Sequence, residues 1–128
     1  MKRSLLLLLS LVLISCGSTT KIGNGVAETY GYEESNAIRV GGENYNQGPL
    51  YERQYLDRLT GPNGEKITYH RTGSCCGFET ENGIQGYGML DKYEVSYDGL
   101  EKPVILYLNM YDPHEGTPIA PRGFLLKD

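Results

Sequence analysis

Hydrophobic and polar residues alternate most regularly from Met89 to Tyr97, and this period of two predicts a β-strand. One face of that strand carries Met89, Asp91, Tyr93, Val95 and Tyr97. The run from Pro103 to Tyr111 is apolar on both faces, which is typical of a central strand. Asp98-Gly99 is a turn signal between the two runs. The sequence therefore predicts an antiparallel hairpin over residues 89–111.

A helical period follows Gly48-Pro49. Its apolar stripe consists of Tyr51, Tyr55, Leu56 and Leu59. Proline is favourable at the first helical position, and Gly61-Pro62 supplies the stop, so we expect one amphipathic helix over residues 48–59. Its remaining positions carry charged side chains, which we expect to form a solvated outer face: Glu52, Arg53, Asp57 and Arg58.

Shorter β-favouring runs occur elsewhere in the chain. They are Tyr30–Tyr32, Ala37–Val40, Lys66–Thr72 and Gly123–Leu126. A glycine-rich loop is expected from Gly73 to Gly88. Together these elements predict the α+β class, with a small antiparallel β-sheet, one short amphipathic helix packed on it, and a single domain over residues 29–128.

The N-terminal segment predicts export. The positive Met1-Lys2-Arg3 precedes ten almost uniformly apolar residues, Leu5 to Ile14. As a helix this run covers about half of a ~30 Å bilayer core, so it predicts a signal peptide over residues 1–15 and not a permanent span.

The signal ends Leu13-Ile14-Ser15-Cys16, which resembles the lipobox of bacterial lipoproteins. The resemblance implies that Cys16 is lipidated and becomes the mature N-terminus; the alternative is an ordinary signal with a chance cysteine. Several acyl chains give stable membrane anchoring. Residues 16–28 are mostly small and polar and predict a flexible tether. No acidic run follows Cys16, so we expect an outer-membrane protein that faces the periplasm.

Charge excludes one large class of partner. Removing Lys2 and Arg3 with the signal lowers the formal net charge from −4 to −6. Nucleic-acid binding depends on neutralising phosphates with Lys and Arg, so we expect no nucleic-acid partner.

Adjacent cysteines are the most distinctive chemical feature. Cys75 and Cys76 are flanked by glycines, and three interpretations stay open: a vicinal disulfide, two buried free thiols, or a soft-metal or redox site. Adjacent Cα atoms lie closer than a disulfide usually requires, so a vicinal bridge would be strained. His70 and His114 are weak candidate metal ligands, because neither spacing matches a known signature.

Catalytic arrangements have weak support. Ser74, His70 and Asp91 contain the residue types of a hydrolase triad, but no nucleophile-elbow pattern surrounds the serine. Paired carboxylates suited to glycosidase chemistry are Glu79 with Glu81, or Asp91 with Glu94. Nothing in the sequence fixes their separation, and we expect no cofactor.

Six stretches between Tyr30 and Asp112 stand out together: Gly31-Tyr32, Ile38–Gly42, Gly61–Glu65, Gly73–Cys76, Leu90–Val95 and Val104–Asp112. They resemble a family of small bacterial lipoproteins. Some members carry the label 2-dehydro-3-deoxyphosphooctonate aldolase, which implies a cytosolic barrel enzyme. The chain is too short for a barrel of ~250 residues and carries an export signal, so that activity is disfavoured. The resemblance supplies no catalytic residues.

The sequence therefore favours a non-catalytic binding or assembly module of the cell envelope. It is attached to the membrane through the lipid on Cys16, and its partner is an envelope protein, a peptide or a glycan. The expected contact surface is the 73–88 loop with Cys75, Cys76 and Phe78. The rival interpretation is a thiol or metal protein centred on the cysteine pair.

Overall fold

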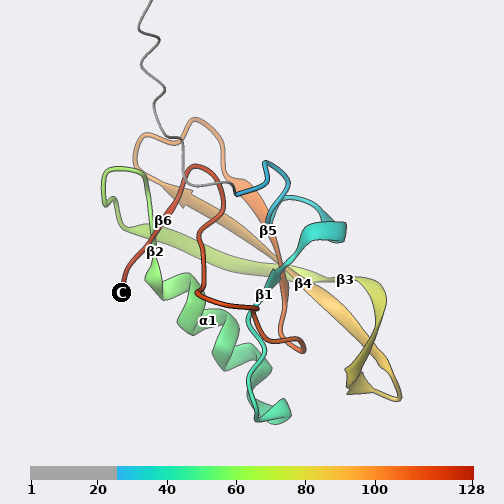
Figure 1. Ribbon diagram of the computed structural model, residues 1–128. Helices are drawn as coiled ribbons and strands as arrows, with labels where there is room; N and C mark the ends of the chain where they lie inside the picture. Colours follow the sequence, from blue (N-terminus) through green and yellow to red (C-terminus); the bar gives the residue numbers. More distant parts are fainter. Residues whose placement is uncertain (1–25) are drawn as a thin grey trace, which may run out of the picture.

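Two antiparallel strands, β4 (Tyr87–Tyr97) and β5 (Val104–Asn109), form the centre of the fold and confirm the predicted hairpin. The computed structural model describes residues 26–128 (Figure 1). The predicted signal peptide, Cys16 and most of the tether lie outside the described residues.

The main sheet has four strands in the order β1-β5-β4-β3. β1 (Ile38–Arg39) pairs with β5 in parallel, whereas the other pairings are antiparallel. Together with α1 (Gly48–Arg58), this architecture confirms the α+β class.

Helix α1 forms where the apolar period predicts it. Proline occupies its first turn, and the N–H of Leu59 donates to the carbonyl of Leu56 at its end. The helix lies against one face of the sheet. The hydrophobic core contains the largest fully buried apolar side chains, which are Ile38, Leu56, Leu59, Leu106, Leu108 and Val95. Removing this apolar surface from water is the main stabilising contribution to the fold.

Short elements outside the main sheet complete the described part of the domain. A second, two-stranded sheet pairs β2 (Leu59–Thr60) with β6 (Leu125–Leu126), which confirms the predicted C-terminal strand. The N-terminal run Tyr30–Tyr32, expected to be a strand, is instead a turn that precedes the short 3₁₀ helix η2 (Glu34–Asn36). Another 3₁₀ turn, η3 (Tyr45–Gln47), leads into α1.

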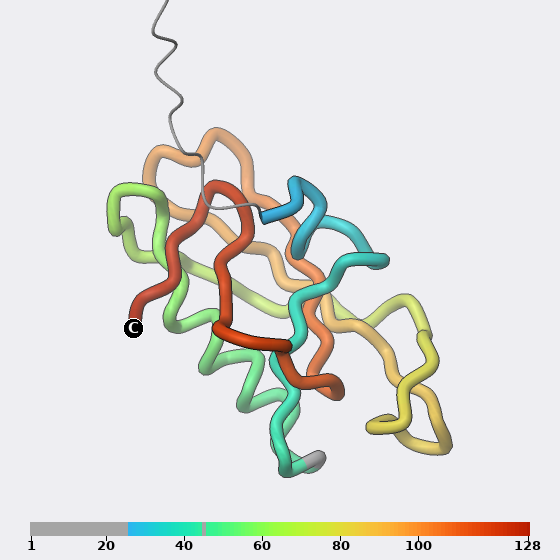
Figure 2. The backbone as a smooth tube through the Cα atoms, viewed as in Figure 1, coloured from blue at the N-terminus to red at the C-terminus, as the bar shows by residue number. Residues whose placement is uncertain are grey.

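The prediction of a loop over residues 73–88 is wrong. Strand β3 (Ile67–Ile84) runs through most of it, because β4 supplies hydrogen-bond partners along nearly its whole length. Three register shifts interrupt the pairing, after Arg71, Cys75 and Glu79. Such bulges let glycine-rich sequence remain in a sheet while the strand bends. Figure 2 shows the result, a hairpin (residues 77–88, yellow) that projects away from the rest of the domain.

Within the described part of the chain, no helix is both long enough and apolar enough to cross a membrane.

Candidate functional site

The cysteine pair lies at the second bulge of β3, where the projecting hairpin begins. Cys75 is opposite Leu90, Gly77 is opposite Met89, and Cys76 between them has no partner on β4. Cys76 also has a φ of 58°, a left-handed conformation that non-glycine residues rarely adopt. The bulge lets two successive side chains meet, and their sulfur atoms are joined in a disulfide between Cα atoms 3.7 Å apart.

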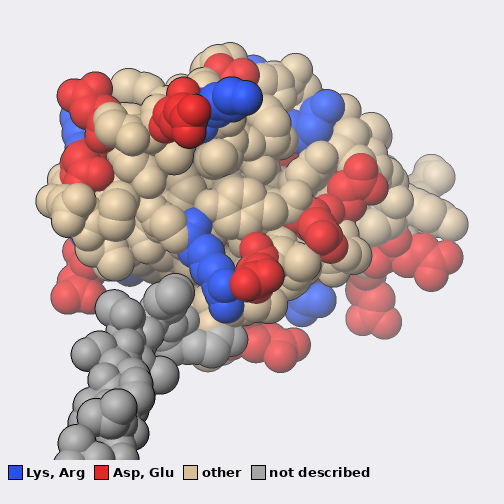
Figure 3. Space-filling view, turned by 90° about the horizontal axis from the view of Figure 1, so that it is seen from above, with Lys and Arg blue, Asp and Glu red and all other residues tan. Residues whose placement is uncertain are grey.

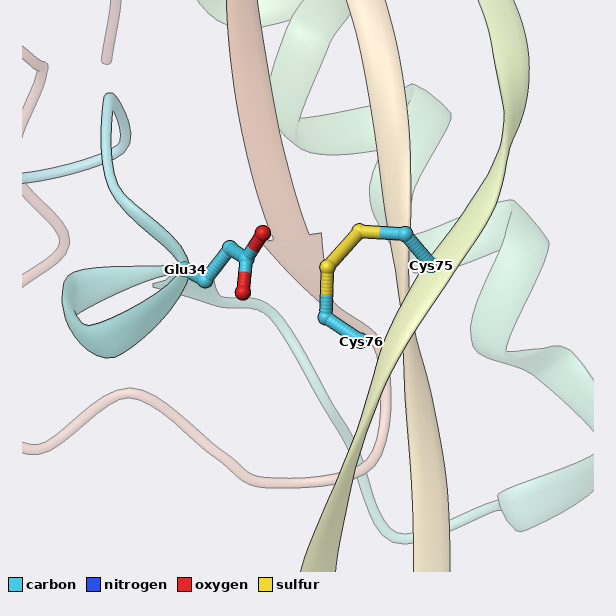
Figure 4. Close-up of side chains that lie close together, drawn as sticks. All are labelled: Glu34, Cys75 and Cys76. Carbon is cyan, nitrogen blue, oxygen red and sulfur yellow. A yellow bond between two sulfur atoms is a disulfide. The ribbon is translucent and has the colours of Figure 1, made fainter.

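A carboxylate faces this disulfide. The oxygen of Glu34 and the two Sγ atoms all lie within 4.8 Å of one another. Figure 4 shows the Glu34 side chain extending from η2 towards the sulfur atoms on β3. Both cysteines are partly accessible, and Glu34 is exposed. This juxtaposition joins segments about forty residues apart in the sequence, and no local pattern predicts it.

Neither histidine joins this cluster. The Nε2 atom of His70 lies 4.0 Å from a carboxylate oxygen of Glu94, on the strand that pairs with β3. The ring of His114 contacts the carbonyl of Thr117 at 2.8 Å. In the structure of residues 26–128, the weak ligand candidates are therefore engaged elsewhere.

Phe78 is part of the packing at the base of the hairpin. Its ring meets that of Tyr111 edge to face, with centroids 5.9 Å apart. A Cβ at Gly88 would lie 2.7 Å from the Tyr111 ring, so glycine allows the close approach. Phe78 also lines an open cavity of about 440 Å³, whose charged walls include Arg39 and Glu79.

Asp112 fixes the hairpin to the end of β5. Its carboxylate accepts side-chain hydrogen bonds from Thr80 at 2.5 Å, Asn82 at 3.0 Å and Asn109 at 2.9 Å. Burial would raise the pKa of Asp112, but these donors outweigh it and hold the pKa below its usual range. The hairpin is thus held to the end of β5 through its β3 side, while its turn at Gln85-Gly86 is exposed.

Exposed apolar side chains lie along the hairpin and at its start on β4. Ile84, Tyr87 and Met89 are 81%, 59% and 48% exposed. In the strand register Tyr87 is opposite both Glu79 and Ile84 and is two residues from Met89, so the three apolar side chains share one face of the hairpin with Glu79. We call this set the hairpin surface. Large apolar side chains grouped in this way are typical of contact sites.

A second cluster lies under α1 and contradicts the prediction for Glu52, which was expected on the solvated face of the helix with Arg53 and Asp57, both of which are exposed. Glu52 is completely buried, and its Oε2 accepts a hydrogen bond of 2.9 Å from the Tyr93 hydroxyl. Asp91, also buried, accepts two bonds of 3.0 Å from Arg71 and one of 2.7 Å from Ser74. The other oxygen of Glu52 has no hydrogen-bond partner among the described residues.

The pKa values of the two carboxyl groups shift in opposite directions. Burial, followed by the negative charge of Asp91, raises the pKa of Glu52 to about 8. Burial also acts on Asp91, but hydrogen bonds from Arg71 and Ser74 outweigh it and lower the pKa of Asp91. At neutral pH, Glu52 is therefore mostly protonated beside the ionised Asp91 carboxylate.

This cluster bears on one of the two weakly supported carboxylate pairs, Asp91 with Glu94. Asp91 lies beside Glu52 and not beside Glu94, because Glu94 points to the opposite face of β4. Ser74 does contact Asp91, but His70 is opposite Glu94 on that other face, so the three do not form a triad.

Sequence signals for Glu52 and Asp91 were present. Glu52 precedes Tyr55, Leu56 and Leu59 by three, four and seven residues, which places it on their stripe. Asp91 falls on the apolar face of an alternating strand. A charged residue in step with buried neighbours indicates a buried polar group that requires a partner.

Surface charge is mixed. On the face shown in Figure 3, acidic side chains form several separate patches, with isolated basic groups between them. No protein-family model, curated protein or solved structure matches the chain.

Proposed function

We propose that this protein is a lipid-anchored component of the bacterial cell envelope whose domain binds another envelope protein through the hairpin surface. The observation that carries this proposal is the grouping of Ile84, Tyr87 and Met89 on one face of a projecting hairpin. Exposed apolar residues held together on an anchored element provide area that a partner can bury.

The partner is recognised through side chains and not by addition of a strand. β3 is an edge strand of the main sheet, so one of its sides lacks a neighbour among residues 26–128. Its three register shifts interrupt that edge. Bulges of this kind are a known protection against edge-to-edge pairing, which favours contact on the face of the hairpin.

The negative charge of the hairpin indicates what kind of protein surface would be complementary to it. Between Gly77 and Gly88 the chain has two acidic residues, Glu79 and Glu81, and no lysine or arginine. Both acids are exposed beside the apolar group. A complementary protein surface would offer aliphatic or aromatic side chains bordered by Lys or Arg.

Anchoring restricts where the partner is met. With Cys16 lipidated, an extended tether over residues 16–28 reaches at most about 45 Å. The domain would then contact proteins in or close to the membrane, on the periplasmic face of the outer membrane. A Cys16→Ser variant is expected to lose fatty-acid labelling and to leave the membrane fraction; unchanged labelling would contradict lipidation at this residue.

Photo-crosslinking in the producing cell tests the binding proposal. A photoreactive amino acid at position 87 should give a discrete adduct, whereas the same group at the exposed Lys102 should not. Ile84→Ser with Met89→Ser should abolish a crosslink from position 87. The matched control is Leu50→Ser, an exposed apolar residue on α1, which should leave it intact. Equal adducts at positions 87 and 102 would refute the hairpin as the contact site.

A further inference from the structure

We propose that reduction of the Cys75–Cys76 disulfide creates a site for a thiophilic divalent metal ion, with Glu34 as the third ligand. The site stands on the contact between η2 and the β3 bulge and does not depend on a partner at the hairpin surface.

The three candidate ligand groups already lie close together in the folded chain. The carboxylate of Glu34 and both sulfur atoms lie within 4.8 Å of one another, on segments that belong to different parts of the chain. A tetrahedral zinc ion, with Zn–S of ~2.3 Å and Zn–O of ~2.0 Å, spaces such ligand atoms about 3.5 to 3.8 Å apart. Shifts of about 1 Å therefore convert the present arrangement into a ligand set.

The Glu34 carboxylate has no other polar partner among residues 26–128. It forms no hydrogen bond or ion pair there, whereas the carboxylates of Asp91 and Asp112 each accept several hydrogen bonds. A disulfide has no proton to donate, so it forms no hydrogen bond with this carboxylate. Beside two thiolates and a cation, the carboxylate supplies a negative oxygen ligand.

The bulge in β3 places both cysteine side chains on the same side of the strand. In a regular strand, adjacent side chains point to opposite faces, so Cys75 and Cys76 could not bind one ion. The extra residue at this bulge and the φ of 58° at Cys76 direct both sulfurs to the same side. Their partial exposure leaves the fourth coordination position open to water.

The chemistry is a two-step change. A dithiol reductant transfers two electrons and two protons to the Cys75–Cys76 bond, which breaks to give two thiols, while the reductant becomes a disulfide. The metal ion then binds as the two thiols release their protons. Because disulfide sulfurs are not thiolate ligands, the oxidised chain lacks the site, and metal binding reports the redox state.

Cadmium titration tests this site in the full chain. Cys16→Ser leaves Cys75 and Cys76 as the only cysteines, and the chain is kept in non-ionic detergent. One sample is reduced with a phosphine and desalted without oxygen; the other stays oxidised. Cd²⁺ binding is followed by thiolate-to-metal absorption and by competition with a chelator. We expect one ion per reduced chain and none per oxidised chain.

The ligand role of Glu34 has its own control. Glu34→Gln should weaken Cd²⁺ binding by roughly tenfold or more, whereas Glu33→Gln, at the preceding exposed position, should stay within about twofold. Circular dichroism confirms that each variant is folded. Equal binding by oxidised and reduced chains, no binding after reduction, or an unchanged affinity in Glu34→Gln would each overturn the proposal.

Discussion

Replacing Glu52 with glutamine should make the stability of this domain much less dependent on pH. Glu52 is buried against Asp91 and accepts a hydrogen bond from Tyr93. Glutamine has the same shape, and its carbonyl accepts from Tyr93 while its amide lies beside Asp91. The substitution therefore keeps the Tyr93 contact and removes only the ionisable proton.

The magnitude follows from the two protonation equilibria. The pKa of Glu52 is about 8 in the folded chain against 4.5 for an ordinary glutamate. Between these values the folded chain holds a proton that the unfolded chain has released. Each pH unit then lowers the free energy of unfolding by about 1.4 kcal/mol. From pH 5 to pH 8 the loss is about 3 to 4 kcal/mol, a large part of the ~5–15 kcal/mol that stabilises a domain.

Urea unfolding at pH 5, 6, 7 and 8 measures this effect. The full chain with Cys16→Ser, in detergent, is compared with and without Glu52→Gln by far-ultraviolet circular dichroism. Other titrating groups are common to both proteins and cancel in the difference between them. The stability advantage of Glu52→Gln should grow by about 3 kcal/mol across this range.

A constant difference between the two proteins would refute the reasoning. It would mean that Glu52 ionises in the folded chain as readily as in the unfolded one. The control is Glu33→Gln at an exposed position, which should follow the parent protein at every pH. Lower stability of Glu52→Gln at pH 5 alone would indicate a packing defect, and the slope with pH would still decide the question.

Three further substitutions test the packing. Leu108→Ala should cost about 3 kcal/mol in urea unfolding, because Leu108 is completely buried between α1 and the sheet; a loss below 1 kcal/mol would contradict that packing. Asp112→Ala should cost about 2 kcal/mol and speed amide exchange in the hairpin, since three donors lose their acceptor; unchanged exchange would disprove its anchoring role. Gly41→Ala should lower stability by about 1–3 kcal/mol, because its Cβ would lie 2.4 Å from a backbone oxygen. Gly77→Ala, with its nearest atom at 3.9 Å, is the matched control and should have little effect.

The sequence predicted those elements whose signals are local. Helix α1 and the β4–β5 hairpin have clear periods and turn residues, so both appear where expected. Strand β3 was missed beyond Thr72, because its glycines suggest a loop and only pairing with β4 keeps it extended. β-propensity is a weak guide wherever the partner strand determines the outcome.

In the candidate sites too, the residues with a local sequence signal were identified, and those brought in by tertiary structure were missed. Cys75 and Cys76 were identified from adjacency alone, but Glu34 reaches them through tertiary structure, about forty residues from its position in the chain. Glu52 was assigned to the solvated face although it shares a stripe with Leu56. Its partner Asp91 is on a distant strand, so the pairing that explains its burial has no local signal.

The parallel pairing of β1 with β5 has a consequence for how the chain acquires its structure. Ile38 aligns with Leu108, seventy residues later, and Leu59 aligns with Leu126, sixty-seven residues later. Synthesis proceeds from the N-terminus, so both early segments stay without these neighbours until about seventy further residues have been made. Closing such long loops is slow. Folding is therefore expected to be slow and to finish only after β5 and β6 have been made.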